Sequence, residues 1–269
     1  MKKLFEKMKK SELPNRLVGV LICLVTALSV NAEAASQPDD LIADRPGFST
    51  GTHSVTPGKF YLEIGYQYSF NTEKNLHNYS DIPDLNLRIG IANKLELFVM
   101  WDGWSISHYK GIDGIGSGNA IEAGLPGLGA KYQLVRADDY NITLLGMLEG
   151  TDANNSYSVD PALALAWDYE LSGRFELFGL VQGGYEANPG NNDFLTLFAM
   201  GLGFEINDRM ETFAEYYNIA YPGTGKLQNG SEFGIMYLLN SDTQLDIYGG
   251  YGFGREMDHY MGLGISRRF

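Results

Sequence analysis

The chain has 269 residues and carries 33 acidic against 20 basic side chains, a formal net charge of −13. This balance excludes nucleic acid as a partner, because binding a phosphate backbone requires clustered positive charge. Glycine, tyrosine and phenylalanine are abundant, with 33, 17 and 14 residues. Glycine permits bends in a curved sheet, and tyrosine and phenylalanine suit a membrane interface.

Residues 1–34 have the layout of a secretory signal peptide. Six basic residues lie between Lys2 and Arg16, an apolar run extends from Leu17 to Val30, and a small-x-small site follows at 32–34. The alternative is a transmembrane anchor, but the 14 apolar residues fall short of the roughly 20 that a spanning helix needs. We predict cleavage after Ala34, which removes six basic and three acidic residues and leaves a net charge of −16.

The mature chain is predicted to contain no cysteine, because Cys23 is the only one and lies within the leader. Disulfide and thiol chemistry are therefore excluded from the folded protein. Lipidation of Cys23 is disfavoured, since the residue before a lipoprotein cysteine is small and here it is Ile22.

Residues 35–58 form a polar extension, rich in proline and glycine, ahead of the first predicted strand. Two placements remain open: the extension folds into the barrel lumen as a partial plug, or it hangs in the periplasm. Arg45 is its only basic residue. Burial of Arg45 among lumen carboxylates would favour the plug, because opposite charges stabilise each other in a poorly solvated site.

Twelve segments between residues 59 and 269 alternate apolar and polar residues, as in Leu95-Glu96-Leu97-Phe98-Val99. A β-strand points successive side chains to opposite faces, so each segment has an apolar face and a polar face. The predicted strands are 59–70, 83–91, 95–107, 123–135, 140–151, 159–170, 174–187, 193–206, 210–220, 228–239, 243–254 and 259–269.

These segments predict an all-β fold: a transmembrane antiparallel up-and-down β-barrel of about twelve strands over 59–269, with a short N-terminal extension. A soluble β-sandwich would also alternate, but its strands are usually only about 5–6 residues long. Short connections rich in asparagine, aspartate and glycine also alternate with longer links, as in bacterial outer-membrane barrels. We therefore predict the outer membrane of a Gram-negative bacterium, with both chain ends on the periplasmic side.

The apolar faces are predicted to contact lipid, with Trp101 and Trp167 in the aromatic girdles. The polar faces are predicted to line the lumen, which is mostly acidic, since a bare carboxylate facing lipid is costly. The candidate lumen-lining residues are Glu63, Gln67, Arg88, Glu96, Asp102, Glu149, Asp168, Arg174, Glu176, Gln182, Glu205, Glu232 and Asp246, with Glu211 and Glu215 from the poorly alternating strand 210–220. Arg88 and Arg174 are interpreted as ion-paired struts rather than binding groups.

Phe269 is a terminal aromatic residue that resembles the C-terminal assembly signal of outer-membrane barrels. Met261, Leu263 and Ile265 share its face, whereas Arg267 departs from the pattern, where an apolar residue is usual. We expect the last strand to engage the barrel-assembly machinery. Outer-membrane lipid, lipopolysaccharide and small-molecule solutes are the other expected partners.

The N-terminal motif consists of Asp44, Arg45, Pro46, Gly47 and Phe48, followed by a Pro-Gly turn at 57–58 and the first strand. This region resembles the start of the mature chain in a family of outer-membrane transporters named for the meta-pathway of phenol degradation. Beyond the first strand the resemblance rests on the barrel pattern. It implies a barrel that exports or admits small, often apolar or aromatic, molecules.

Catalysis finds little support, and we predict that the protein is not an enzyme. Outer-membrane phospholipases place a Ser-His-Asn constellation on the outer barrel face, and Ser107-His108 resembles part of it. No Asp-Ser-Asn-Gly-type segment accompanies this pair. A hydrolase is the least favoured of the function classes considered.

No metal site and no cofactor are predicted. The loop residues Asp152, Asn154, Asn155 and Asp160, and the group formed by Asp193 with 191–192, lack the regular spacing of calcium ligands. The glycine-rich stretch 111–119 lacks the lysine of a phosphate loop.

The leading function is passive passage of small molecules, with weak cation preference from the acidic lumen. If the lumen is plugged, apolar cargo would instead leave sideways through the wall. The alternative is a closed structural or partner-binding barrel. Its lumen would be filled by paired charges and by the extension, with no continuous water path.

Overall fold

The computed structural model describes residues 41–70, 78–109, 118–153, 156–188, 191–253 and 259–269. None of these residues belongs to a helix long and apolar enough to cross a membrane. The predicted signal peptide lies outside the described residues. The strands are β1 (Phe60–Phe70), β2 (Asn78–Ala92), β3 (Leu95–Trp101), β4 (Trp104–Tyr109), β5 (Gly118–Ala123), β6 (Gly127–Arg136), β7 (Tyr140–Ala153), β8 (Ser156–Ser172), β9 (Phe175–Asn188), β10 (Asn191–Asn207), β11 (Met210–Tyr221), β12 (Lys226–Asn240), β13 (Thr243–Gly252) and β14 (His259–Arg268).

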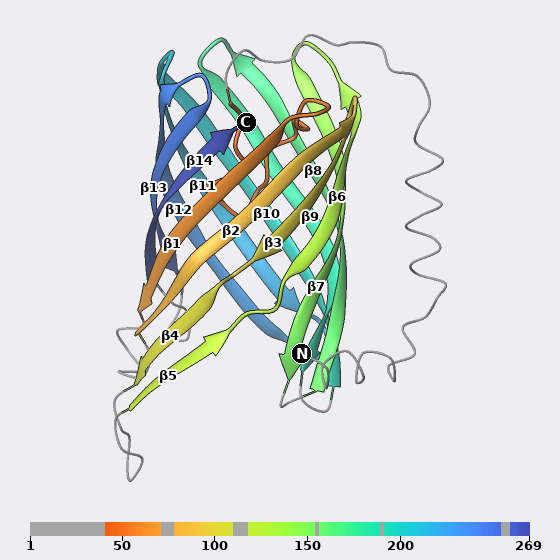
Figure 1. Ribbon diagram of the computed structural model, residues 1–269, viewed down its shortest axis with the longest axis vertical. Coiled ribbons are helices and arrows are strands. Elements are labelled where there is room, and N and C mark those ends of the chain that lie inside the picture. The colour runs from red at the N-terminus through yellow and green to blue at the C-terminus, as the bar shows by residue number, and fades with distance from the viewer. Residues whose placement is uncertain (1–40, 71–77, 110–117, 154–155, 189–190, 254–258) are drawn as a thin grey trace. The chain divides into compact units, whose positions relative to one another are not determined.

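The sheet closes on itself because β1 pairs antiparallel with both β2 and β14. Each strand position around the barrel wall is called a stave here. Two of the staves each consist of two successive strand segments. β3 and β4 pair one after the other with β2, while β6 and β5 pair with β3 and β4 in turn. The fourteen segments therefore form twelve antiparallel staves, and the predicted all-β barrel is confirmed (Figure 1).

The two ends of the barrel differ in their connections. The turn end, uppermost in Figure 1, carries the short connections 93–94, 137–139, 173–174, 208–209 and 241–242. Asparagine side chains shape two of these turns: the Asn207 side chain accepts a hydrogen bond from the backbone N–H of Arg209, and Asn240 accepts one from Asp242, at 3.0 and 2.9 Å. The opposite end, where the remaining connections lie, is called the loop end.

The structure corrects three predicted strands. The strand expected at 83–91 begins earlier, at Asn78, and those expected at 95–107 and 123–135 are interrupted. The first break follows from Gly103, which has a φ of +68° and no room for a Cβ, which would lie 2.4 Å from the carbonyl oxygen of Pro83. The second break includes Pro126, which has no N–H to donate to a ladder.

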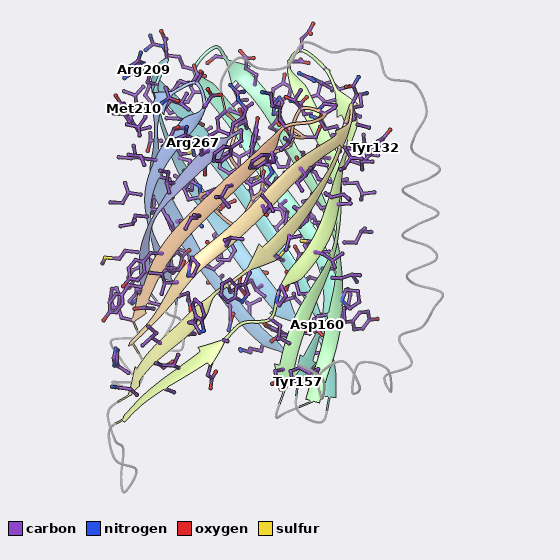
Figure 2. The ribbon with its side chains drawn as sticks, in the orientation of Figure 1. Tyr132, Tyr157, Asp160, Arg209, Met210 and Arg267 are labelled. Carbon is purple, nitrogen blue, oxygen red and sulfur yellow. The ribbon has the colours of Figure 1, made fainter. Side chains whose placement is uncertain are left out.

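The outer surface of the barrel is apolar, as an environment of lipid requires. On β8, Leu163 and Leu165 are exposed by 59% and 39%, while Ala164 and Ala166 between and beside them are buried. On β11 the inner face holds carboxylates and aromatic rings together, since Phe213, Glu215 and Tyr217 are all buried. This explains why the strand at 210–220 alternates poorly in sequence. Figure 2 shows the outward side chains along the staves.

Residues 41–57, called the inner segment, pass through the barrel at its turn end (Figure 1). The segment begins where the backbone N–H of Leu41 donates to the carbonyl of Ser241, at 2.9 Å. Leu41 and Val55 pack with Tyr61 of β1. Gly90 of β2 lets the segment pass, because a Cβ there would lie 2.1 Å from the carbonyl oxygen of Thr56.

Candidate functional site

The lumen contains a buried cluster of five charges contributed by four staves and the inner segment. Arg88 of β2 donates hydrogen bonds to Glu96 at 2.9 Å and to Glu63 at 3.0 Å. Lys131 of β6 donates to both carboxylate oxygens of Asp44, at 2.6 and 2.7 Å, and Asp44 also lies 3.1 Å from Arg88. Buried charges of this kind are tolerated only when they are paired, so the cluster fixes Asp44 and its neighbours against the barrel wall.

The backbone of the inner segment is held by lumen side chains around much of the barrel. Glu215 of β11 accepts hydrogen bonds from the N–H groups of Phe48 and Ser49, at 2.8 and 2.9 Å. Glu96 accepts one from Val55 at 2.7 Å, and Thr143 of β7 donates to the carbonyl of Thr52 at 2.5 Å. These bonds satisfy polar groups that would otherwise be buried unpaired.

Arg45 lies among carboxylates on the other side of the segment. It forms ion pairs with Asp84 of β2 and Asp246 of β13, and its guanidinium lies 5.8 Å from the ring centroid of Tyr248. Burial alone would lower the pKa of Arg45, but the charges of Asp84 and Asp246 outweigh it and raise the pKa further. The guanidinium is therefore charged at every physiological pH.

The pKa of Asp44 is set by the same competition. Burial would raise it, but the charges of Arg88 and Lys131 outweigh burial and lower the pKa below its ordinary 3.8. Asp44 is thus the ionised link between the inner segment and the two buried cations of the wall.

We expect acid to weaken the docking of the inner segment only below about pH 4. A carboxyl whose pKa is lowered by folding stabilises the folded form above its unfolded pKa, and this stabilisation is lost as the pH falls through the folded value. The urea midpoint of the refolded barrel, measured from pH 7 to pH 3, should fall more steeply below about pH 4 in the parent than in Asp44→Asn. Parallel pH profiles for the two proteins would contradict this role of Asp44.

A cavity of about 580 Å³ lies on the loop-end side of the inner segment. Polar and apolar side chains are mixed around its lining. The polar ones include Asp84, Asn86, Asp102, Gln182 and Glu232, and the apolar or aromatic ones include Phe98, Met100, Leu145, Leu180 and Tyr217. Phe48 of the inner segment stacks on Tyr217 with the ring centroids 3.9 Å apart, which adds an aromatic surface to the floor of the cavity.

Two further cavities lie on either side of this one along the barrel axis. A cavity of about 530 Å³ toward the loop end shares Gln67, Asp84 and Asp102 with the first. A cavity of about 390 Å³ lies toward the turn end and is lined by Glu176, Glu205 and Glu211. The inner segment contributes residues to the first and third cavities, so it lies between the loop-end space and the turn-end space.

The structure places the sequence-predicted lumen residues as follows. The charge cluster contains Glu63, Arg88 and Glu96; the cavities are lined by Gln67, Asp102, Glu176, Gln182, Glu205, Glu211 and Glu232; and contacts with the inner segment are made by Asp168, Glu215 and Asp246. Glu149 lies exposed on β7 toward the loop end. Arg174 was predicted wrongly as a lumen strut, because β9 begins one residue later and leaves Arg174 exposed in a turn.

Several residues of the site were not identified from the sequence. Lys131 shares parity with the inward-facing Gln133, so alternation on that strand could have placed it in the lumen. The inward-facing Leu145 and Leu180 were missed because inward positions were expected to be polar. Asp84 lies within the predicted strand 83–91 and shares parity with Arg88, so alternation on that strand could have placed it in the lumen.

The histidine considered for catalysis lies at the edge of the barrel. His108 shares a hydrogen bond with Asn119 of β5, with 2.8 Å between Nδ1 and Oδ1, and the pair is exposed. Ser107 precedes His108 on strand β4 and therefore points to the opposite face. The arrangement thus does not bring this serine to the histidine.

The described residues contain no group of three or more histidine, cysteine, aspartate or glutamate side chains able to hold a metal ion. Of the loop residues considered as calcium ligands, Asn154 and Asn155 lie outside the described part of the chain. Asp160 accepts a hydrogen bond from Thr151 at 2.7 Å.

Comparison with known proteins places the fold among outer-membrane porins. No family model and no curated protein matches the sequence. The chain is similar to the NanC porin, with a TM-score of 0.55 and 10% identity over 77% of this chain and 98% of that chain. It is also similar to the KdgM porin, with a TM-score of 0.52 and 10% identity over 77% of this chain and 99% of that chain.

Proposed function

We propose that the protein is a channel of the Gram-negative outer membrane that admits small solutes with an apolar or aromatic body, preferring neutral or positively charged ones. The observation that carries this proposal is the 580 Å³ cavity, whose lining combines carboxylates with apolar and aromatic side chains. A solute with a ring and an amino group would find partners of both kinds in it. The resemblance of residues 44–48 to the outer-membrane transporter family named for the meta-pathway of phenol degradation is consistent with such solutes.

The electrostatics of the space toward the loop end support the charge preference. Among the described residues, the basic side chains near this space are Arg45, which is already paired, and Lys226. A cavity lined by one sign of charge concentrates ions of the opposite sign and repels its own. Among the described residues, the carboxylates near the loop end are Asp81, Asp84, Asp102, Glu122, Glu149, Asp152, Asp160, Glu186 and Asp193.

This charge distribution separates the proposed solutes from acidic sugars. One structure of the KdgM porin is a complex with oligogalacturonate, a polyanion, at 9% identity to this chain and a TM-score of 0.51. A polyanion entering the lumen described above would meet an excess of carboxylates. The proposal therefore does not extend that ligand to this protein.

A closed structural barrel is the second candidate function. It is favoured by the inner segment and the five-charge cluster, which occupy the lumen at the turn end, the end that faces the periplasm in outer-membrane barrels. Passage along the axis would then require the inner segment to move.

Three probes that share one ring test the proposal: benzylammonium, benzyl alcohol and benzoate. We expect proteoliposomes containing the mature protein to take up benzylammonium at least about fivefold faster than benzoate, because the carboxylates near the loop end repel the anion. The double variant Asp102→Asn/Glu122→Gln should bring the two rates closer together. The double variant Asp208→Asn/Asp242→Asn, altered at the turn end, is the matched control.

If each of the three probes entered liposomes at the same rate with and without the protein, uptake would be set by the lipid alone. This result would overturn the channel and favour the structural barrel. Faster uptake of benzoate than of benzylammonium would refute the proposed charge preference.

A further inference from the structure

The barrel wall is incomplete between β5 and β7. β5 pairs along one side with β4, at Trp104–Ala123 through Tyr109–Gly118. The β6–β7 ladder ends at Leu128–Leu148, and beyond it the backbone N–H of Gly150 donates to the carbonyl of Pro126 at 3.3 Å. From this level toward the loop end, no ladder pairing joins β5 to β7 in the described part of the chain, and the strands diverge in the lower part of Figure 1.

The divergence is built into the sequence, because two neighbouring staves break at the same level. The backbone N–H of Gly124 donates to the carbonyl of Gly103 at 2.8 Å, which joins the two breaks. The indole N–H of Trp101 donates to the carbonyl of Gly124 at 2.8 Å, and its ring meets that of Trp104 edge-on at 4.8 Å. These contacts hold the β4–β5 hairpin at an angle to the rest of the wall.

A cavity lies at this divergence. The 530 Å³ cavity is lined by Asp81 and Asp102 on the lumen side, by Glu122 on β5, and by Gly150 and Asp152 on β7. It shares three lining residues with the 580 Å³ cavity, so the space at the two free strand edges adjoins the central lumen cavity.

The opening lies where the outer surface is still apolar. Trp104 and Ile121 on the β4–β5 hairpin are exposed by 46% and 69%, and Val159, the register partner of Gly150, is exposed by 44%. Backbone groups on an open sheet edge cannot be satisfied by lipid, so such an edge persists in a membrane only where it faces water, protein or a solute. The free edges of β5 and β7 therefore require a polar, hydrated gap at the margin of the apolar band.

We propose that this gap is a side portal through which amphiphilic solutes pass between the lumen cavity and the outer leaflet. The inference rests on the proposed channel function and names its route. Trp104 and Ile121 offer an apolar surface to the body of the solute outside the barrel. Asp102 and Glu122 inside the portal attract a positively charged group, so cationic amphiphiles with an aromatic or alkyl part fit best.

The width of the portal is tested by cysteine pairs in the mature chain, where no cysteine is expected. Ala123→Cys/Asp152→Cys places one thiol on each free edge, and Leu128→Cys/Leu148→Cys is a matched control at paired positions. Under mild oxidation we expect a disulfide in the control pair only, while the edge pair is joined only by longer bis-maleimides. Rapid disulfide formation by the edge pair would overturn the portal, because the edges would then be in contact.

The route is tested by uptake of 4-butylbenzylammonium into proteoliposomes containing each folded variant, with folding confirmed by the heat-dependent mobility of the barrel on gels. Joining the edge pair with a bis-maleimide should slow uptake at least about fivefold relative to the same variant left unjoined, whereas joining the control pair should not. Unchanged uptake after joining the edges would overturn the portal and leave the channel function standing. Absence of protein-dependent uptake in every variant, joined or not, would overturn the channel function itself.

Discussion

Deletion of residues 41–57 is expected to turn a nearly silent barrel into one with stable, cation-preferring conductance steps. The inner segment lies between the loop-end cavities and the turn-end cavity, so we expect its removal to join them into one wide, water-filled path. The path would be flanked by carboxylates at both ends, among them Asp102 and Glu176, which favour cations.

The measurement is single-channel conductance of the refolded mature protein in a planar bilayer, with a salt gradient across it. Deletion of residues 35–40 is the control, because it shortens the extension but keeps the inner segment. Full conductance in the parent would show that the segment does not close the lumen. Silence in the 41–57 deletion, once it is shown to be folded, would favour the closed structural barrel.

Replacement of Arg88 by leucine is expected to lower the free energy of unfolding by about 3–5 kcal/mol, because it leaves buried carboxylates without their partner. Arg88 is 1% exposed, while Glu63 and Glu96, its two acceptors, are each 0% exposed. Arg88→Lys should fall between the parent and Arg88→Leu, since lysine keeps the charge but not the forked donor geometry.

Urea unfolding in phospholipid vesicles, followed by tryptophan fluorescence, measures this loss. Arg268→Leu is the matched control, since it breaks the ion pair with Asp242, whose side chain is 53% exposed. An exposed pair contributes at most about 1 kcal/mol. If Arg88→Leu were no less stable than Arg268→Leu, the cluster would not be the anchor described here.

Sequence periodicity was sufficient to predict the barrel, because alternation is a local property of each strand. It placed Glu63, Arg88 and Glu96 on polar faces. Short turns, such as those at 93–94 and 241–242, indicated that consecutive strands are antiparallel neighbours in the barrel. Alternation fails where the chain itself breaks the pattern. The breaks at Gly103 and at 124–126 reverse which residues face outward, and the side opening depends on them.

The partners within the lumen could not be predicted, because they join positions far apart in sequence. Lys131 lies 87 residues from Asp44, and Glu215 lies 167 residues from Phe48. No local pattern connects such positions. For Arg45 the sequence predicted the kind of partner but not its identity. A single arginine in a polar extension ahead of an acidic lumen suggested pairing with a carboxylate, without identifying Asp84 or Asp246.

The inner segment has a consequence for the order in which the protein folds. Its partners extend along the chain from Glu63 to Asp246, and Gln244 lies 199 residues beyond Arg45. The contacts of the segment are therefore complete only when almost every stave is in place. Contacts between distant parts of a chain form late, because the entropy of closing long loops opposes them. Residues 41–57 precede every stave in the chain, yet we expect them to reach their native positions late and to be enclosed when β1 pairs with β14.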